Sequence, residues 1–268
     1  MVTNIKKQRE EYLEKVTEAE AEKLAIRFGA GHDHWRTWVG PPMNYDVQSA
    51  MQFQLLTNVG LREYHRLLEV GCGSLRAGRL FITYLLEGRY YGVEPNEKIM
   101  REGVVGNFGA ELENSPIIKD RKPSFSHNSD FDFSFTESEV DFAIAQSIAS
   151  HTGPAELKRL LTNLAQVSHD GTLCLVTYGR ILNPVNEVKE DGWYYPECVA
   201  FTPRKFSDIA KNSGFNHMYH INWPLMNVSE DGTHTTTQQI AVLTKRPWKA
   251  PLSVQVAGVA GFRPIEAF

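Results

Sequence analysis

The chain has 268 residues, of which 42% are hydrophobic and 22% charged, and its formal net charge is −4 at pH 7. This length holds one large α/β domain with modest additions, and the composition is that of globular proteins and not of disordered or fibrous ones. The slightly acidic balance argues against a broad electrostatic grip on DNA or RNA, so we expect no nucleic-acid partner.

The cysteines and the N-terminal residues indicate the cellular compartment in which we expect the protein. Cys72, Cys174 and Cys198 are far apart and odd in number, which favours a reducing compartment over a disulfide framework. The N-terminal string KKQREEYLEK is charged, so we expect no signal peptide. No run approaches the ~18–20 apolar residues of a membrane span. We therefore expect a cytoplasmic protein with no membrane partner.

The first 60 residues predict a helical extension or lid that precedes the main domain. Residues 4–28 predict a surface helix rich in Glu and Lys, with apolar residues along one face. Such a helix packs on the body of the protein or forms a lid or a dimer arm, so a homodimer stays open. The next loop, GAGHDHWRTWVGPPMNY, has the composition of surface loops that often line sites. A second helix is predicted over about 46–59.

Strands and helices alternate from residue 66 onward. We predict strands at RLLEV, YYGVEP, PSFSHNS, VDFAIAQ and TLCLVTY. Helices are predicted between them over 75–86, 96–108 and 154–167. Such alternation implies right-handed crossovers and a parallel sheet that is covered by helices on both faces.

This rhythm breaks after residue 178. Residues 179–200 are irregular and too long for an ordinary connection, so we interpret them as an insertion. Thr202 and Pro203 then start a helix that runs to about residue 212, and FNHMYHI and TTQQIAVLTKR are the last two strands. We expect one α/β domain over 61–246, with a doubly wound, mostly parallel seven-stranded sheet, and a tail over 247–268.

Two glycines and an acid stand at the ends of the first two predicted strands. The string LLEVGCGSLRAGR places Gly71 and Gly73 between a strand and a helix, where glycine allows a sharp turn and close approach of a ligand to the helix amides. Glu94 ends the next strand, 21 residues after Gly73. Because parallel strands end at the same edge, Glu94 can reach the ribose hydroxyls of an adenosine bound there. A surface acid at a strand end is the alternative interpretation.

The loop also distinguishes between nucleotide types. A pyrophosphate-binding loop has the pattern Gly-x-Gly-x-x-Gly, but Arg76 occupies the position of its third glycine. Glu69, two residues before Gly71, would repel a diphosphate and attract the amino and sulfonium groups of S-adenosylmethionine. The sequence therefore favours a methyl donor over NAD.

The motif ExGxG, followed by a helix and then by an acid that ends the next strand, resembles the first two motifs of class I (Rossmann-like) S-adenosylmethionine-dependent methyltransferases. The resemblance extends over roughly 61–245, and GCGSLRAGRLFITYL and YYGVEPN are similar to bacterial methyltransferases of sugars, lipids or secondary metabolites. One departure is Leu75, where the family has a further glycine. The resemblance implies the cofactor S-adenosylmethionine and methyl transfer to a hydroxyl or amine of a small-molecule acceptor.

The resemblance also implies a set of donor contacts along the strand ends. In chain order they are Glu69, Gly71, Cys72, Gly73, Arg76, Glu94, Pro95, Asn96, Asp130, Phe131, Gln146, Ser147 and Ile148. The first four would hold the methionine end, Glu94 the ribose, and Asp130 and Phe131 the adenine. Arg76 would bind the donor carboxylate or a substrate anion, unless it only makes an ion pair at the helix start. The last three would lie under the sulfonium.

The candidate base and acceptor residues follow from where the methyl group would lie. His151 follows the fourth strand and titrates near neutral pH, so it is the candidate catalytic base, with a helix cap as the alternative. The aromatic residues expected around the acceptor are Trp38, Tyr45, Tyr178, Trp193 and Tyr194. We assign no metal ligand, although the spacing of His32 and His34 leaves open a site completed by a later residue such as His234.

Two other functions remain open from sequence. An NAD-dependent oxidoreductase would need the pyrophosphate loop that Glu69 and the missing third glycine disfavour. A non-catalytic donor-binding or scaffold protein would use the helical N-terminus for assembly. The Asn/Asp-Pro-Pro-Tyr signature of amide and base methylation does not follow the fourth strand, where the chain has AQSIAS, so we do not expect methylation of proteins or nucleic acids.

Overall fold

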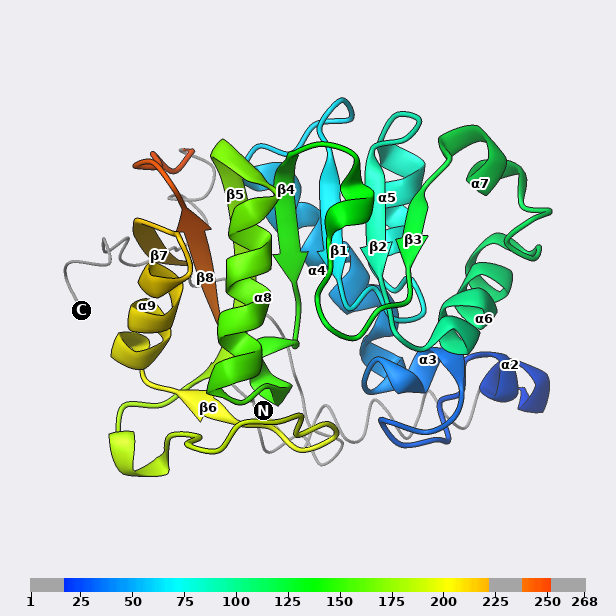
Figure 1. Cartoon of the computed structure of the whole chain (residues 1–268). Helices are drawn as coiled ribbons and strands as arrows, with labels where there is room; N and C mark the ends of the chain where they lie inside the picture. The colour runs from blue at the N-terminus through cyan, green and yellow to red at the C-terminus, as the bar shows by residue number, and fades with distance from the viewer. Residues whose placement is uncertain (1–16, 222–237, 252–268) are drawn as a thin grey trace.

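A computed structural model describes residues 17–221 and 238–251 of the chain. A twisted sheet runs through the middle, with α8 and α9 on one face and α4 and α5 on the other (Figure 1). The strands are β1 (Leu67–Val70), β2 (Tyr90–Val93), β3 (Ser124–Ser126), β4 (Val140–Ala145), β5 (Ser168–Arg180), β6 (Ala200–Phe201), β7 (His217–Ile221) and β8 (Gln238–Thr244). The helices are α2 (Glu18–Lys23), α3 (Trp35–Trp38), α4 (Tyr45–Asn58), α5 (Gly78–Tyr84), α6 (Glu97–Phe108), α7 (Pro116–Arg121), α8 (Pro154–Gln166) and α9 (Pro203–Asn212). Short 3₁₀ turns are η1 (Pro42–Asn44), η2 (Ser134–Thr136), η3 (Ala149–His151) and η4 (Pro184–Asn186).

The strand order along the sheet is β3-β2-β1-β4-β5-β8-β7. The pairs from β3 to β5 are parallel, whereas β8 runs antiparallel to both β5 and β7. This confirms the doubly wound, mostly parallel seven-stranded sheet. The structure adds the two-residue strand β6, which pairs with Gly179 and Arg180 of β5 beyond the last paired residue of β4.

The sheet separates two apolar cores, and this explains why its strands were visible in the sequence. One core joins α4, α5 and α6 to the sheet through residues such as Leu55, Phe81 and Met100. The other joins α8 and α9 to the opposite face through residues such as Leu157 and Phe206. Because both faces are covered, every residue of β1 and β2 is buried, and the central strands are nearly continuous apolar runs.

Two predicted helices have different bounds in the structure. The helix expected over 75–86 begins only at Gly78, because Leu75 has φ +60°, a left-handed conformation that cannot belong to a right-handed helix. The helix expected over 4–28 is described only as α2, which ends at Lys23 before Ala25 turns left-handed at φ +52°. Residues 4–16 lie outside the described part of the chain. By contrast, α9 starts after Thr202, whose hydroxyl accepts from the Lys205 amide, as predicted.

The segment before β1 is anchored on α5 and α6. Asp46 accepts hydrogen bonds of 2.6 Å from both Arg36 and Arg79, and the Arg36 guanidinium lies 4.3 Å from the centre of the Tyr45 ring. On α6, a Cβ at Gly106 would lie only 2.4 Å from the ring of Trp35, so this glycine lets α3 pack closely. The segment before β1 therefore packs against α5 and α6, the two helices next to the glycine loop.

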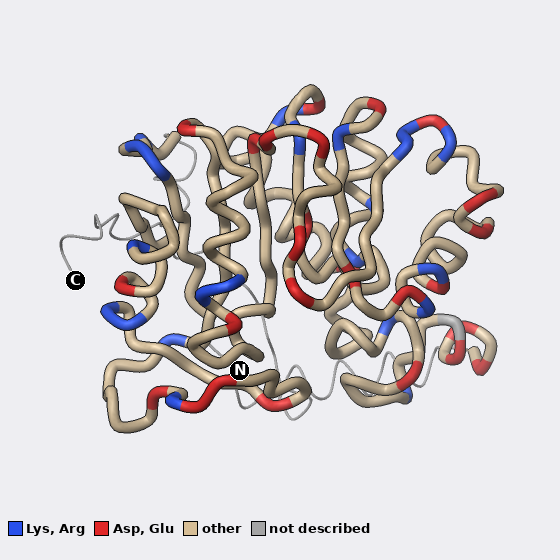
Figure 2. The backbone as a smooth tube through the Cα atoms, viewed as in Figure 1, with Lys and Arg blue, Asp and Glu red and all other residues tan. Residues whose placement is uncertain are grey.

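Charged residues are mixed along the backbone of the described chain. In the view of Figure 2, Lys and Arg are scattered among Asp and Glu along the backbone. Two acids in the insertion bond to helix starts: Asp191 accepts from the Ala155 amide at the first turn of α8, and Glu187 accepts from the amide of Thr202, the N-cap of α9. These acids fix the insertion against the body of the domain.

Close packing of α6 on the glycine loop makes a stability prediction. A Cβ at Gly103 would lie 2.2 Å from the backbone oxygen of Ser74, and a backbone atom cannot rotate away. We expect Gly103→Ala to lower the free energy of unfolding by about 2 kcal/mol or more in a denaturant titration, because the loop must shift. Val105→Ala, at a 45% exposed position of the same helix, is the matched control and should change this free energy by less than about 0.5 kcal/mol. Equal stability of the two variants would contradict the packing described.

Candidate functional site

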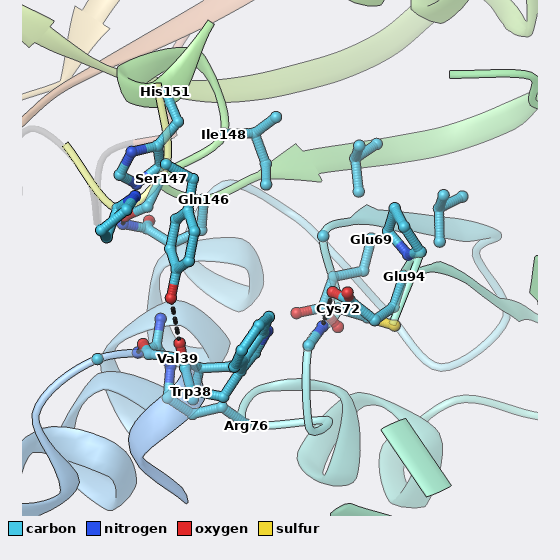
Figure 3. Close-up of a pocket in the computed structure, with 18 of the residues that line it drawn as sticks. Trp38, Val39, Glu69, Cys72, Arg76, Glu94, Gln146, Ser147, Ile148 and His151 are labelled. Carbon is cyan, nitrogen blue, oxygen red and sulfur yellow. Dashed lines mark hydrogen bonds between the residues drawn. The ribbon is translucent and has the colours of Figure 1, made fainter. Parts of the chain in front are cut away.

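A cavity of about 590 Å³ opens at the carboxyl ends of the central parallel strands. Its lining comes from the segment before β1, from α4, from the glycine loop, from the ends of β2, β3 and β4, and from the insertion. Figure 3 shows Gln146, Ser147, Ile148 and His151 on one side of it, with Glu69, Cys72 and Glu94 on another and Trp38, Val39 and Arg76 on a third. The topology thus brings strand ends that are far apart in sequence to one site.

The loop after β1 is held in left-handed backbone conformations. Gly71 has φ +71° and Gly73 has φ +54°, and a Cβ at either would lie within 2.3 Å of a neighbouring side chain, Ile148 or Val39 respectively. Leu75 has a positive φ as well, at an expected cost of about 1–2 kcal/mol, and its fully buried side chain belongs to the core that covers α5. The departure from the family pattern at Leu75 therefore leaves the left-handed turn in place.

The same loop is held from behind by side chains of α4 and α6. The carbonyl oxygen of Ser74 accepts from Tyr45 Oη at 3.1 Å and from Asn107 Nδ2 at 3.0 Å. The structure therefore does not bring Tyr45, predicted as an acceptor contact, to the cavity. Its ring is only 1% exposed and supports the loop from the interior.

Glu94 connects the ends of β1 and β2. Its Oε2 accepts from the Gly73 amide at 3.0 Å and its Oε1 from the Asn96 amide at 2.9 Å. Burial raises the pKa of this carboxyl despite these two bonds. Since each oxygen has further lone-pair capacity, Glu94 presents two fixed acceptors to the cavity that it lines.

Glu69 lies on β1 at the floor of the same cavity and is 5% exposed. Its Oε2 accepts from the phenol of Tyr90 at 2.6 Å. Burial raises the pKa of Glu69 to about 7, against the lowering effect of that bond and of Arg76. Near neutral pH this carboxyl therefore gains or loses a proton readily, and a cation in the cavity would favour its charged form.

Arg76 and Tyr195 hold the segment that covers the glycine loop. The Arg76 guanidinium donates to the carbonyl oxygen of Val39, and Tyr195 Oη donates to that of Trp38 at 3.0 Å. Tyr195 comes from the insertion, and its ring lies 5.8 Å from the Trp38 ring and 5.2 Å from the His151 ring. Among the described residues Arg76 does not form the alternative ion pair at a helix start; its guanidinium bonds to the Val39 carbonyl on the same side of the cavity.

The end of β3 differs from the predicted assignment by one or two residues. Asp130 is exposed and does not line the cavity, whereas Asn128, Ser129 and the buried Phe131 do. Asn96 also lies outside the lining, because its side chain caps α6 by accepting from the Ile99 amide.

The turn after β4 carries a network of amides and hydroxyls. Gln238 Oε1, at the start of β8, accepts from Thr177 Oγ1 at 2.8 Å, from Ser147 Oγ at 3.0 Å and from Gln146 Nε2 at 3.2 Å. Ser147 itself has φ +59°, so the turn is strained at the residue beside the cavity. The network places Gln146, Ser147 and Gln238 in the lining together.

His151 lies in η3, and one of its ring nitrogens already forms a hydrogen bond. Its Nδ1 is 2.6 Å from the carbonyl oxygen of Glu197, which can only accept, so Nδ1 carries the proton. Burial lowers the pKa of His151, and the ring is therefore neutral at neutral pH, with its lone pair on Nε2. The alternative role as a side-chain cap of α8 is not seen, since the N-cap of that helix is Gly153 and has no side-chain bond.

The structure brings most of the predicted site residues to this cavity. In the lining are Trp38, Glu69, Gly71, Cys72, Gly73, Arg76, Glu94, Pro95, Phe131, Gln146, Ser147, Ile148, His151 and Trp193. Two predicted acceptor residues of the second half of the chain are not. Tyr178 is buried against Phe206 and bonds to His220 at 2.9 Å, and Tyr194 donates to the Glu190 carbonyl.

Several lining residues carried no predicted role. Gln48 and Gln52 face the cavity from α4, and Oε1 of Gln52 is buried with no hydrogen-bond partner among the described residues. Their spacing of four on a predicted helix places them on one face, which is the signal available in the sequence. Tyr195 and Gln238 depend on contacts between distant segments, and no local pattern marks them.

The histidines considered for a metal have other contacts. His34 Nδ1 accepts from the Arg36 amide and so caps α3, and the His32 ring stacks on Phe28 with centroids 4.2 Å apart. His234 lies outside the described residues. Within 17–221 and 238–251 no cluster of three potential metal ligands occurs, and no helix there is both long and apolar enough to cross a membrane.

Glu69 makes a pH prediction for the unliganded protein. A pKa raised from 4.5 to about 7 means that the fold favours the protonated carboxyl, so this stabilisation is present below pH 4.5 and is lost as pH rises through 7. The difference in free energy of unfolding between Glu69→Gln and the parent protein should therefore change with pH. We expect it to shift in favour of the variant by about 3 kcal/mol between pH 4.5 and 8. Glu139→Gln, at an exposed position, should keep a constant difference from the parent. A constant difference for Glu69→Gln as well would contradict its burial as a neutral acid.

Comparison with known proteins bears on the fold. No protein-family model matches the chain, and no curated protein matches it either. Among solved structures, it is similar to magnesium protoporphyrin IX methyltransferase from Synechocystis PCC 6803 with bound SAH, at 12% identity and a TM-score of 0.53 over 76% of this chain and 84% of that one. It is also similar to an S-adenosylmethionine-dependent methyltransferase from Clostridium acetobutylicum ATCC 824 (11% identity, TM-score 0.51, 75% and 91% covered) and to Streptomyces venezuelae DesVI (12%, 0.50, 87% and 100%). With its strand order and antiparallel β8, the chain has the class I methyltransferase fold.

Proposed function

We propose that this protein transfers the methyl group of S-adenosylmethionine to an amine or hydroxyl of a small molecule. The observation that carries the proposal is the pair Glu69 and Glu94, which lie in one cavity on either side of the left-handed glycine loop. Among the described lining residues, Arg76 is the only lysine or arginine. A cation in the cavity favours the charged form of both acids, whereas a diphosphate would find only one buried, already bonded arginine, so the lining suits a cationic nucleoside better. The similar structures named as methyltransferases support the same conclusion.

Residues at the strand ends would hold the donor. Glu94 would accept from the ribose hydroxyls with the lone pairs that its two backbone bonds leave available. Phe131 would pack against the adenine, and Asn128 and Ser129 take the polar positions at the end of β3 in place of Asp130. Glu69 would face the amino group of the methionine part.

The chain's own part in the chemistry is alignment and removal of a proton. When bound, S-adenosylmethionine supplies a methyl carbon already activated by its sulfonium. Ile148 and Ser147 would border that carbon, and His151 Nε2 would accept the proton that the acceptor loses. Trp38 and Tyr195 close this part of the cavity, which limits the access of water.

A small molecule fits the cavity better than a polymer segment does. The volume of about 590 Å³ is that of typical ligand pockets, and the donor would fill a large share of it. The aromatic rings of Trp38, Trp193 and Tyr195 supply apolar walls for the remainder. Free, buried Cys72 and Cys174 agree with an enzyme of the cytoplasm.

A titration of the protein with S-adenosylmethionine and with NADH tests the choice of cofactor. Calorimetric binding of the first and not of the second is the expected result. Binding of NADH alone would favour an oxidoreductase, and binding of S-adenosylmethionine without S-adenosylhomocysteine release on any acceptor would favour a donor-binding scaffold.

Glu94 makes a prediction for donor affinity. Glu94→Gln keeps the shape of the side chain but removes its charge and one acceptor oxygen, so we expect the Kd for S-adenosylhomocysteine to rise about 10- to 100-fold. The matched control is Glu97→Gln, three residues further on the surface of α6 and outside the cavity. An unchanged Kd for Glu94→Gln in calorimetry would refute the placement of the ribose.

His151 makes a prediction for turnover. We expect His151→Ala to lower kcat by about 100-fold or more with an unchanged Kd for the donor. In the parent protein the rate should hold at pH 6.5 and fall only at lower pH, because burial lowers the pKa of His151 below 6.5 and protonation of Nε2 removes the base. His169→Ala, at the opposite end of the sheet beside Asp141, is the control for the loss of a histidine. Full activity of His151→Ala would make the residue structural.

A further inference from the structure

The insertion holds the backbone of the turn that carries His151. The Tyr194 amide donates to the His151 carbonyl at 2.9 Å, and the Val199 amide donates to the Ser150 carbonyl at 2.7 Å. Residues 194–199 thus bond to η3 at two successive carbonyls. These bonds fix the backbone of His151 but not its side chain, whose two torsion angles are set by other contacts.

Two contacts restrict the angle of the His151 ring. Nδ1 donates to the Glu197 carbonyl at 2.6 Å, but a hydrogen bond of this kind stays favourable over about 30° from linearity, so it leaves the ring some freedom. The Tyr195 ring supplies the second contact: its centre lies 5.2 Å from that of the His151 ring, and the two planes are 75° apart. Aromatic rings that meet edge to face have a preferred geometry. Because the bond restrains Nδ1 and the ring contact restrains the plane, the two together restrict the direction of the Nε2 lone pair.

Tyr195 is itself anchored on a distant part of the chain. Its Oη donates to the Trp38 carbonyl at 3.0 Å, the bond drawn as a dashed line beside Trp38 in Figure 3, and the two rings lie 5.8 Å apart. A Cβ at Gly31 would lie 3.7 Å from the same Oη, so the hydroxyl is in close contact with the segment before β1. Tyr195 is 46% exposed, so burial alone does not fix its ring. The hydroxyl bond and the Trp38 ring therefore hold it in place.

From these contacts we propose that Tyr195 is a positioning residue for His151. Its ring fixes the angle of the imidazole, and its hydroxyl fixes that ring on the Trp38 carbonyl. This inference rests on the proposed function, in which His151 Nε2 accepts the proton of the methyl acceptor, and it adds a residue that acts through the base. Tyr195 transfers no proton itself, because its hydrogen is bonded to the Trp38 carbonyl. Burial and the charge of Glu94 also raise the pKa of Tyr195.

The ring and the hydroxyl of Tyr195 can be removed separately. Tyr195→Phe keeps the ring against His151 and deletes the bond to the Trp38 carbonyl, whereas Tyr195→Leu deletes both. A loosened imidazole should lose its single tautomer, because Nδ1 then bonds to the Glu197 carbonyl only part of the time. Burial is the largest influence on the pKa of His151 and lowers it, so uncovering the ring should move this pKa up toward 6.5. A residue that only closed the cavity would leave the tautomer unchanged.

The test follows the His151 ring by NMR in the full-length protein, without any methyl acceptor. Long-range proton–nitrogen spectra report the tautomer of each histidine, and the signals that are lost in His151→Gln identify His151. In the parent protein we expect the form with the proton on Nδ1 and a pKa below 6.5. In Tyr195→Leu we expect both tautomers and a pKa shifted toward 6.5, and in Tyr195→Phe a smaller change of the same kind. Tyr64→Leu is the matched control, because this exposed tyrosine lies 4.4 Å from the ring of another histidine, His65, and should leave the His151 signals unchanged.

An unchanged tautomer in Tyr195→Leu would overturn the inference. A Tyr195→Phe protein whose His151 signals match those of the parent would overturn the anchoring role of the hydroxyl. If Tyr195→Leu does not fold, Tyr195→Phe decides, since it removes only the hydroxyl oxygen at a half-exposed position. Calorimetry with S-adenosylmethionine on the parent protein separates this inference from the proposed function. A protein that does not bind this donor fails the proposed function, whereas the spectra still decide whether Tyr195 fixes the His151 ring.

Kinetics give a second readout if phenethylamine or 2-phenylethanol supports S-adenosylhomocysteine release. Tyr195→Leu should then lower kcat by about tenfold or more, because a small misplacement of the base is costly. In a His151→Ala background the same substitution should have no further effect, since a positioning residue acts through the base. Equal losses in the two backgrounds would overturn the inference. If neither compound reacts, the spectra decide alone.

Discussion

One side-chain hydrogen bond ties the glycine loop after β1 to the acid that follows β2, and the site is built around this pair. The Gly73 amide donates to Glu94 Oε2, so the loop after β1 and the acid after β2 hold each other in place across the sheet edge. The loop needs this support, because three of its residues have positive φ, including Leu75, which has no glycine's freedom to adopt it. Behind the loop, Tyr45, Asn107 and the close approach of Gly103 fix the Ser74 carbonyl.

The order of strands and helices was predictable because burial on both faces leaves a clear trace. The strands β1, β2 and β4 and the buried part of β5 are largely apolar runs, and α8 and α9 each start at a proline that follows an extended N-cap residue. The start of α5 was not predictable, because a leucine in a helix-like pattern gives no sign of a left-handed backbone. That conformation is imposed by tertiary packing of its buried side chain.

Site residues were predictable where a strand end fixes them and not where two segments must meet. Glu69 and Glu94 follow from position alone, since parallel strands end at one edge. At β3 the strand is only three residues long, and Asn128 and Ser129 line the cavity where Asp130 was expected. Tyr178 was predicted at the site but does not reach it. Side chains alternate between the two faces along β5, and this alternation turns the Tyr178 ring into the core beside α9, away from the cavity.

The bond from Tyr195 to the Trp38 carbonyl joins residues 157 positions apart and closes the cavity between them. Because the Tyr195 ring also lies 5.2 Å from the His151 ring, one tyrosine of the insertion contacts both the segment before β1 and η3. A substitution of Tyr195 would therefore disturb the wall of the cavity at Trp38 and the wall at His151 together, so the two walls are structurally coupled through the insertion.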